Sequence, residues 1–327
     1  MKIKRTIKIF FVGAFVLSVS TGNFFAQSQH QLTSKKQVEK NEIHYRTIKA
    51  DGLNVFYRES GPKDAPVVLL LHGFPTSSFM YRNLIPILST KYHVIAPDMP
   101  GFGFTDSPDT SKYNYTFESL TKTMQAFIGE LGLKRFAVYI FDYGAPVGLR
   151  LALANPEKIT GIISQNGNAY EEGMSQGWNG LKEYWKHRTP EKKEEIIRPV
   201  MSLKTTKWQY ETGVSDLSLI EPETYTLDQH FLDRPGMADK QMDLMADYES
   251  NIKLYPAFHA YFRKHQPMLL AVWGNKDPYF IPPGAEAFKR DLPHATVKLY
   301  DTGHFALETH LKEISTDILE FLAKLPK

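Results

Sequence analysis

Residues 136–150 constrain the fold more than any other stretch of the chain. They begin with FAVYIF at 136–141, a run of apolar and aromatic residues without polar alternation. Such a run is typical of a strand that is buried on both faces, as in a parallel sheet. Asp142 follows at once, and then come the small residues Gly144 and Ala145 and, where a first helical turn tolerates it, Pro146. The stretch therefore predicts a buried strand, a sharp corner that presents Asp142, and a helix that begins beside that corner.

The polar residue at this corner has two interpretations. Asp142 could be an N-cap, a residue whose side chain accepts a backbone N–H of the first helical turn. It could instead be a nucleophile, because the corner lifts its carboxylate above the sheet, beside a helix N-terminus that favours negative charge. Residues 136–150 alone leave both interpretations open.

Strand and helix patterns alternate over most of the chain. Residues 45–50 and 53–59 predict a hairpin that turns at Asp51-Gly52. Because strands that alternate with helices pair in parallel, we expect an α/β fold whose mostly parallel sheet has helices on both faces. Further strands are expected at 67–71, 94–96, 159–164, 267–273 and 296–300, and the clearest helices at 78–88, 116–131 and 311–322.

The segment between residues 164 and 267 differs from the rest. It has recurrent helical patterns, no obvious strand run and many aromatic residues. We therefore predict that residues 171–265 form a helical cap, inserted into a core made of residues 29–170 and 266–327. Most of the aromatic side chains in this segment are expected simply to pack the cap. They include Trp178, Trp185, Trp208, Tyr184, Tyr210, Tyr225, Tyr248, Tyr255 and Tyr261.

Residues 1–28 predict a secretory signal peptide. Four basic residues among the first eight precede an apolar run at 9–19, and Ala26-Gln27-Ser28 is a small-x-small cleavage site. We expect an exported protein, periplasmic or secreted, without stable membrane association after cleavage; an uncleaved anchor is the alternative. Without those four residues, the 39 Lys and Arg fall to 35 against 36 Asp and Glu, so charge gives no reason to expect a nucleic-acid partner. The absence of Cys excludes disulfides, thiol nucleophiles and thiolate metal sites.

Three polar residues follow three of the expected strands. Asp142 follows the strand at 136–141, Asp277 comes shortly after the strand at 267–273, and His304 comes shortly after the strand at 296–300. The carboxyl ends of parallel strands meet at one edge of the sheet, where catalytic groups gather in α/β folds. The order of nucleophile, acid and base along the chain matches a catalytic triad. This arrangement favours the nucleophile interpretation of Asp142 over the N-cap interpretation.

With these residues, the chain resembles the aspartate-nucleophile branch of the α/β-hydrolase superfamily over about residues 45–325. HGFP at 72–75 is similar to the pattern of epoxide hydrolases, whereas TSSFMYRN at 76–83 is more similar to haloalkane dehalogenases. The resemblance implies an α/β-hydrolase fold with a cap, and an oxyanion hole formed by the backbone N–H groups of Phe74 and Tyr143. Two departures weaken the dehalogenase interpretation: dehalogenases usually have Trp where this chain has Tyr143, and many have Asn where it has Phe74.

The resemblance implies a small apolar substrate that forms an alkyl ester with Asp142 and is then released by water. An epoxide is the preferred substrate, with a haloalkane as the alternative. Epoxide hydrolases use cap tyrosines to protonate the opening ring, and the Trp208-Gln209-Tyr210 cluster makes Tyr210 the preferred donor and Trp208 a further substrate contact. No metal or organic cofactor is required by this chemistry.

Two other functions were weighed against this one. GMSQG at 173–177 matches the serine esterase pattern G-x-S-x-G, but the expected strand ends near residue 164, too early for an elbow at Ser175. A binding protein that uses a hydrolase fold without catalysis is the second alternative. Such a protein has no need of a complete triad, and for this reason we prefer an enzyme.

Overall fold

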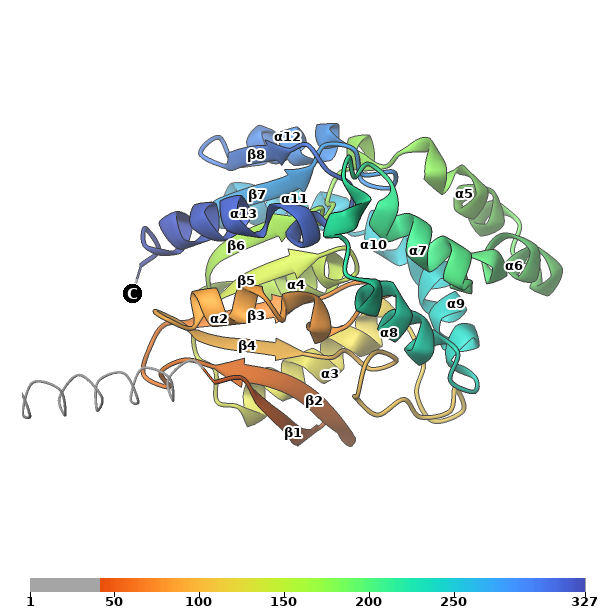
Figure 1. The fold of residues 1–327 in the computed structure, drawn as a ribbon, viewed down its shortest axis with the longest axis horizontal. Helices are drawn as coiled ribbons and strands as arrows, with labels where there is room; N and C mark the ends of the chain where they lie inside the picture. Colours follow the sequence, from red (N-terminus) through yellow and green to blue (C-terminus); the bar gives the residue numbers. More distant parts are fainter. Residues whose placement is uncertain (1–41, 327) are drawn as a thin grey trace, which may run out of the picture. The chain divides into compact units, whose positions relative to one another are not determined.

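The computed structural model describes residues 42–326, so the predicted leader and its cleavage site lie outside the described residues. Within this range the chain forms one eight-stranded sheet in the order β1-β2-β4-β3-β5-β6-β7-β8 (Figure 1). This sheet, with helices on both faces, confirms the predicted fold class. The strands are β1 (His44–Ala50), β2 (Leu53–Ser60), β3 (Val67–Leu71), β4 (His93–Pro97), β5 (Phe136–Phe141), β6 (Ile159–Gln165), β7 (Leu269–Gly274) and β8 (Thr296–Tyr300).

The pairing of the strands brings the predicted site residues to one edge. β1 and β2 form the predicted antiparallel hairpin, with Asp51 and Gly52 at positive φ in its turn. β2 also pairs antiparallel with β4, and all pairs from β4 to β8 are parallel. The loops that follow β3, β5, β6, β7 and β8 therefore leave the sheet at the same edge.

Two hydrophobic layers cover the sheet. Alternate residues of a strand point to opposite faces, so Val68 and Leu70 pack in one layer and Leu69 and Leu71 in the other. The first layer contains α2 (Leu84–Leu88) and α13 (Ala306–Leu322), and the second contains α3 (Phe117–Glu130), α4 (Gly144–Ala154), α11 (Tyr255–His265) and α12 (Pro282–Asp291). Both faces of the central strands are thus buried, which explains their unbroken apolar sequences.

The helix expected at 78–88 is the main local error. The structure has a 3₁₀ turn, η1 (Ser78–Tyr81), followed by the short α2. Pro86 has no N–H to donate to the carbonyl of Arg82, so a continuous helix would lose a hydrogen bond at this point. Further 3₁₀ turns are η2 (Pro156–Lys158), η3 (Glu171–Gly173), η4 (Gln176–Trp178), η5 (Arg198–Met201) and η6 (Leu217–Leu219).

The chain between β6 and β7 is almost entirely helical. Figure 1 shows its helices grouped beyond the carboxyl ends of the strands, except α11, which packs against α4 and α12 beside the sheet. We call residues 176–252, which contain the helices α5–α10 and the 3₁₀ turns η4–η6, the cap. The helices are α5 (Asn179–Lys186), α6 (Pro190–Ile196), α7 (Leu203–Glu211), α8 (Pro222–Leu232), α9 (Met237–Asp247) and α10 (Glu249–Ile252).

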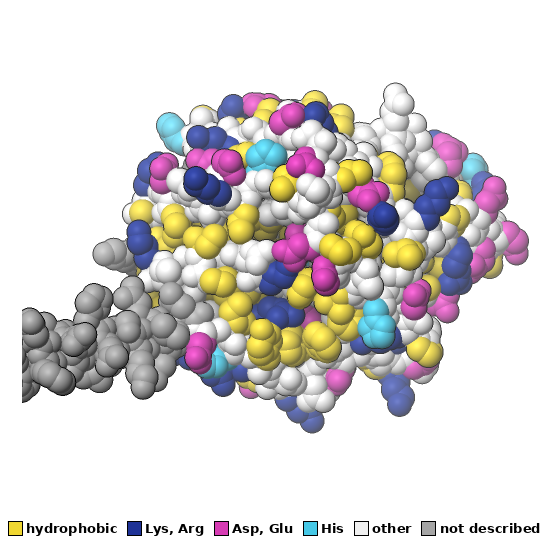
Figure 2. Space-filling model, viewed as in Figure 1, with side chains coloured by type: hydrophobic (Ala, Val, Ile, Leu, Met, Phe, Trp, Pro, Cys, Tyr) yellow, Lys and Arg dark blue, Asp and Glu magenta, His cyan; other side chains and the backbone are white. Residues whose placement is uncertain are grey.

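One face of the molecule shows how its charged side chains are distributed. On the face shown in Figure 2, acidic and basic side chains are interspersed, and hydrophobic side chains gather across the middle. Among the described residues, no helix is both long enough and apolar enough to span a membrane.

Candidate active site

Asp142 occupies a strained corner between β5 and α4. Its φ is +47°, a left-handed conformation that non-glycine residues seldom adopt. Two glycines make room for this corner: a Cβ on Gly73 would lie 2.3 Å from the Cβ of Asp142, and a Cβ on Gly144 would lie 2.2 Å from the carbonyl oxygen of Leu71. This strand–corner–helix geometry is the one that the sequence predicted, and we call it the elbow.

The carboxylate of Asp142 is held by backbone donors. The N–H of Phe74 donates to its Oδ1 at 2.6 Å, and the backbone N–H of Tyr143 also interacts with the carboxylate. Burial raises the pKa of Asp142 to about 6, against the opposing effects of His304 and of these two N–H groups. The side chain is therefore mostly ionised at neutral pH. Its pKa nevertheless lies closer to 7 than the two N–H donors alone would place it.

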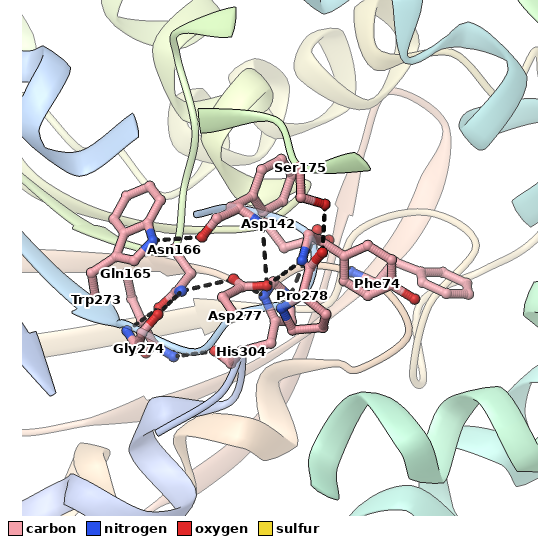
Figure 3. A network of polar contacts seen from close by, with 12 residues as sticks. Phe74, Asp142, Gln165, Asn166, Ser175, Trp273, Gly274, Asp277, Pro278 and His304 are labelled. Atoms are coloured by element: carbon pink, nitrogen blue, oxygen red, sulfur yellow. Dashed lines mark hydrogen bonds and ion pairs between the residues drawn. The ribbon is translucent and has the colours of Figure 1, made fainter. Parts of the chain in front are cut away.

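His304 lies between two carboxylates. Its Nδ1 is 2.6 Å from Oδ2 of Asp277, and its Nε2 is 3.8 Å from Oδ2 of Asp142. Figure 3 shows these side chains converging from the ends of β5, β7 and β8. Burial lowers the pKa of His304, but the charge and hydrogen bond of Asp277, together with Asp142, outweigh burial and raise the pKa above its usual value. The structure thus brings together all three residues of the predicted triad.

Asp277 is fixed by a residue that sequence reasoning missed. The amide Nδ2 of Asn166 donates to Oδ2 of Asp277 at 2.7 Å, and the N–H groups of Tyr279 and Phe280 donate to Oδ1 at 2.7 and 3.1 Å. Asn166 follows β6 directly and has a φ of +45°. A polar residue at the end of β6 was the available signal, because the same rule identified Asp142 at the end of β5.

A cavity of about 180 Å³ lies between the elbow and the cap. From the core it is lined by Asp142, Tyr143, Phe74 and Tyr279. From the cap side its wall is mostly apolar, and its residues are Gly177, Trp178, Gly180, Leu181, Ile196, Val200, Gln209 and Met245. The arrangement places a carboxylate at the floor of a small apolar chamber, as a site for a small molecule requires.

The two predicted substrate contacts from the cap do not line this cavity. Tyr210 is buried, stacks on Phe305 with a centroid separation of 3.8 Å, and donates its hydroxyl hydrogen bond to Asp228 at 2.6 Å. Trp208 is 44 % exposed. Sequence proximity suggested these residues, but the rotation of α7 turns both away from the cavity, and we do not retain Tyr210 as a ring-opening donor.

Ser175 lacks the setting of a serine nucleophile. It is the N-cap of the 3₁₀ turn η4, and its hydroxyl donates to the carbonyl of Pro278 while it accepts the N–H of Gly177. Neither an elbow strand nor a following α-helix places its oxygen above the sheet.

The fold and the elbow define an α/β-hydrolase. Residues 66–311 match the family described as the alpha/beta hydrolase fold, and the chain belongs to this family. An uncharacterized hydrolase of Saccharomyces cerevisiae is 47 % identical over 277 residues, which are 84 % of this chain and 95 % of the yeast protein. The protein is therefore an enzyme of the α/β-hydrolase type.

Similarity to better-described hydrolases is more partial. A haloalkane dehalogenase of Psychrobacter cryohalolentis is 42 % identical over 115 residues, 35 % of this chain and 38 % of the dehalogenase. The crystal structure of an epoxide hydrolase from Vigna radiata matches with a TM-score of 0.68 at 24 % identity, over 86 % of this chain and 98 % of the other. The first match covers little of the dehalogenase, and the second concerns the fold alone, so neither identifies the substrate.

Proposed function

We propose that this protein hydrolyses a small apolar epoxide through an ester intermediate on Asp142. One observation carries the proposal: a carboxylate at a left-handed elbow, held by a backbone N–H at 2.6 Å, lies beside an imidazole that is bound at 2.6 Å to a second carboxylate. A carboxylate is suited to displacing a leaving group at saturated carbon.

In the first step, an oxygen of Asp142 attacks a ring carbon, the carbon–oxygen bond of the epoxide breaks, and the ring oxygen takes a proton. This attack needs no base, because the carboxylate is already charged. The distance of 3.8 Å between His304 Nε2 and Asp142 Oδ2 is longer than a hydrogen bond, as expected if His304 takes no proton from Asp142 in this step. A serine nucleophile, by contrast, must lose its proton to the histidine.

In the second step, Nε2 of His304 takes a proton from water, and the water oxygen attacks the carbonyl carbon of the Asp142 ester. The N–H groups of Phe74 and Tyr143 stabilise the oxyanion that forms. The bond between this carbon and the ester oxygen then breaks, the ester oxygen takes the proton from His304, and a diol leaves. The new carboxyl group of Asp142 loses its proton to the group that protonated the ring oxygen, which restores both for the next turnover. Asp277 stabilises the imidazolium through its bond to Nδ1.

Tyr248 of the cap is the proposed donor of the proton in the first step. It does not line the cavity itself, but it lies directly behind two residues that do, whereas the hydroxyl of Tyr210 is bound to Asp228. The ring of Tyr248 lies 5.9 Å from that of Tyr143 and 4.6 Å from that of Trp178, both of which line the cavity. Burial, Tyr255 and the charge of Asp142 all raise the pKa of Tyr248, so its hydroxyl stays protonated until a stronger base, the opening alkoxide, takes the proton.

A haloalkane dehalogenase is the second candidate, and one observation favours it. The indole Nε1 of Trp185 is buried and has no hydrogen-bond partner within residues 42–326, and its ring lies 6.3 Å from that of Trp178, which lines the cavity; this N–H is the proposed donor to a halide. By contrast, the indole of Trp178 already donates to the carbonyl of Tyr279 at 3.1 Å. We prefer the epoxide, because a tyrosine follows the nucleophile and a buried tyrosine lies behind the cavity wall.

The ester is tested with the variant His304→Gln. Incubated with an epoxide, this variant should accumulate protein heavier by the mass of the substrate, with the added mass on the peptide that contains Asp142. In heavy-oxygen water, the first turnover of the parent enzyme should give a diol without the label. A labelled first product would contradict the proposal, because water would then have attacked the substrate directly.

The substrate is tested by comparing epoxides with haloalkanes, scored by diol and by halide. Tyr248→Phe should lower epoxide turnover by roughly 10²-fold or more, the usual range for loss of a general acid. Tyr210→Phe is the matched control, because this hydroxyl serves Asp228 and not the cavity. Halide release in the absence of diol formation would identify the dehalogenase instead.

A further inference from the structure

We infer that Gln209 is a specificity-determining residue, which hydrogen-bonds a polar substituent on the non-reacting part of the substrate. The inference rests on the proposed function and narrows its substrate class. The substrate would be a small epoxide with an apolar body and one hydroxyl, carbonyl or amide group, in place of a plain hydrocarbon epoxide.

The amide nitrogen of Gln209 is a buried polar group without a partner in the described part of the chain. The residue is 2 % exposed, it lines the same cavity as Asp142, and its Nε2 makes no hydrogen bond within the described part of the chain. Buried polar groups are nearly always paired, because an unpaired one loses its bonds to water without compensation. A bound substrate is therefore the group that would restore the missing bond.

The orientation of α7 explains why this residue faces the substrate. Successive residues of an α-helix are turned by about 100°, so three neighbours point in three directions. Trp208 is exposed, Tyr210 stacks on Phe305 and bonds to Asp228, and the residue between them meets the cavity. Packing on both sides thus fixes the direction of the Gln209 side chain.

The surroundings of Gln209 set the chemistry of the ligand. The other cap side chains that line the cavity are Trp178, Leu181, Ile196, Val200 and Met245, and the indole N–H of Trp178 is engaged by Tyr279. The carboxamide is therefore the free polar group of the cap wall, and it both donates and accepts. A site built in this way discriminates strongly against an analogue that lacks the matching group.

The test compares two epoxides of equal size, one with a terminal hydroxyl and one with a methyl group in its place. For the parent enzyme, kcat/KM should be about tenfold or more higher for the hydroxylated epoxide. Gln209→Met, which keeps the length of the side chain and removes the amide, should abolish this preference, mainly through KM. The matched control Gln176→Met changes an exposed cap residue outside the cavity and should keep the parent ratio.

Thermal unfolding separates this role from a structural one. Because Gln209→Met removes an unpaired buried amide, the ligand-free variant should have a Tm equal to or above that of the parent. A lower Tm with equal losses on both epoxides would indicate a structural role and overturn the inference. An unchanged ratio, or an equal loss of kcat on both substrates, would overturn it as well, the latter because the amide would then act at the reacting atoms.

Failure of the proposed function gives a different result. If both epoxides still form the ester in the His304→Gln background, the proposed chemistry stands whatever Gln209 does. If neither epoxide forms the ester and neither is turned over, the proposed function fails, and the specificity assigned to Gln209 fails with it.

Discussion

At the scale of single residues, two titrating groups each control one step of the proposed reaction. Attack requires ionised Asp142, whose pKa burial raises to about 6. Hydrolysis of the ester requires neutral His304. Burial lowers the pKa of His304, and Asp277 and the charge of Asp142 raise it, but Asp142 loses its charge, and with it this effect, once the ester has formed. The groups interact, so the observed values belong to the pair. The ester can therefore form at a pH at which its hydrolysis is already slow.

We predict that the steady-state fraction of enzyme present as ester rises as the pH is lowered and then levels off. Above the pKa of His304, hydrolysis keeps this fraction small; below it, His304 is protonated and the ester accumulates; below about 6, protonation of Asp142 slows the attack as well, so formation and hydrolysis slow together and the fraction stops rising. Rapid acid quenching followed by mass spectrometry of the intact protein measures the fraction. In His304→Gln the decrease on the alkaline side should disappear. A parent ester fraction that is flat between pH 5 and 9 would contradict the assigned roles.

At the scale of the elements, the corner between β5 and α4 depends on the close approach of α4 to β3. A Cβ at Gly144 would lie 2.2 Å from a carbonyl oxygen of β3, which is backbone and cannot rotate away. Gly144→Ala should therefore destabilise the protein by about 1–3 kcal/mol, the usual cost of overpacking, and slow ester formation by shifting Asp142 from the Phe74 N–H.

Gly129→Ala is the control for this substitution. Gly129 lies in α3, and a Cβ there would meet no atom within 4 Å. Alanine is the better helix former, so this variant should gain about 0.5–1 kcal/mol of stability. Urea unfolding of both variants measures the difference. Equal stabilities for the two alanine variants would show that the elbow tolerates a side chain and that its tight packing is not required.

At this scale the sequence predicts the ends of the strands but not the directions of the cap side chains. Strand ends are predictable because buried strands have unbroken apolar runs, and this is why the sequence predicts that Asp142, Asp277 and His304 meet at one edge of the sheet. The direction of a cap side chain depends on how two helices pack, which local sequence does not encode. For this reason the sequence does not show that Tyr210 points away from the cavity and that its neighbour Gln209 lines it. The apolar spacing at 78–88 predicts one helix, because spacing alone does not show that Pro86 lacks the N–H that would bind the preceding turn. Export stays a prediction.

At the scale of the whole molecule, a partly buried polar cluster joins the cap to the core. Arg82 of the core forms ion pairs with Glu308 of α13 at 2.7 Å and with Glu221, next to α8 of the cap, at 2.9 Å. Nearby, Asp228 of α8 accepts the hydroxyl of Tyr210, while its Oδ1 is buried without a partner in the described structure. Burial raises the pKa of Asp228 to about 7, although Tyr210, Thr76 and Arg82 oppose this effect.

The raised pKa of Asp228 predicts a stability that falls as the pH rises. Its ordinary pKa is 3.8, so between about pH 4 and pH 7 the folded chain holds a proton here that the unfolded chain has lost. Where the folded state binds more protons, the free energy of unfolding decreases with increasing pH. The protein therefore loses stability from this group across that window, and the full cost is present above pH 7.

Asp228→Asn should remove this cost, because an amide keeps an acceptor for Tyr210 and carries no charge. Above pH 7 the variant should be more stable than the parent by about 1–3 kcal/mol, less than the full shift implies at 1.36 kcal/mol per pKa unit, since the buried site can relax. The gain should vanish near pH 4, where the parent carboxyl is also neutral.

Urea unfolding from pH 4 to 8.5 tests this prediction, with exposed Asp64→Asn as the control. The other titrating groups, Asp142 and His304 included, are common to parent and variant, so the pH dependence of their difference reports Asp228. A difference that stays constant over this range would mean that Asp228 is ionised in the folded protein throughout, and that the polar cluster between cap and core stabilises its charge.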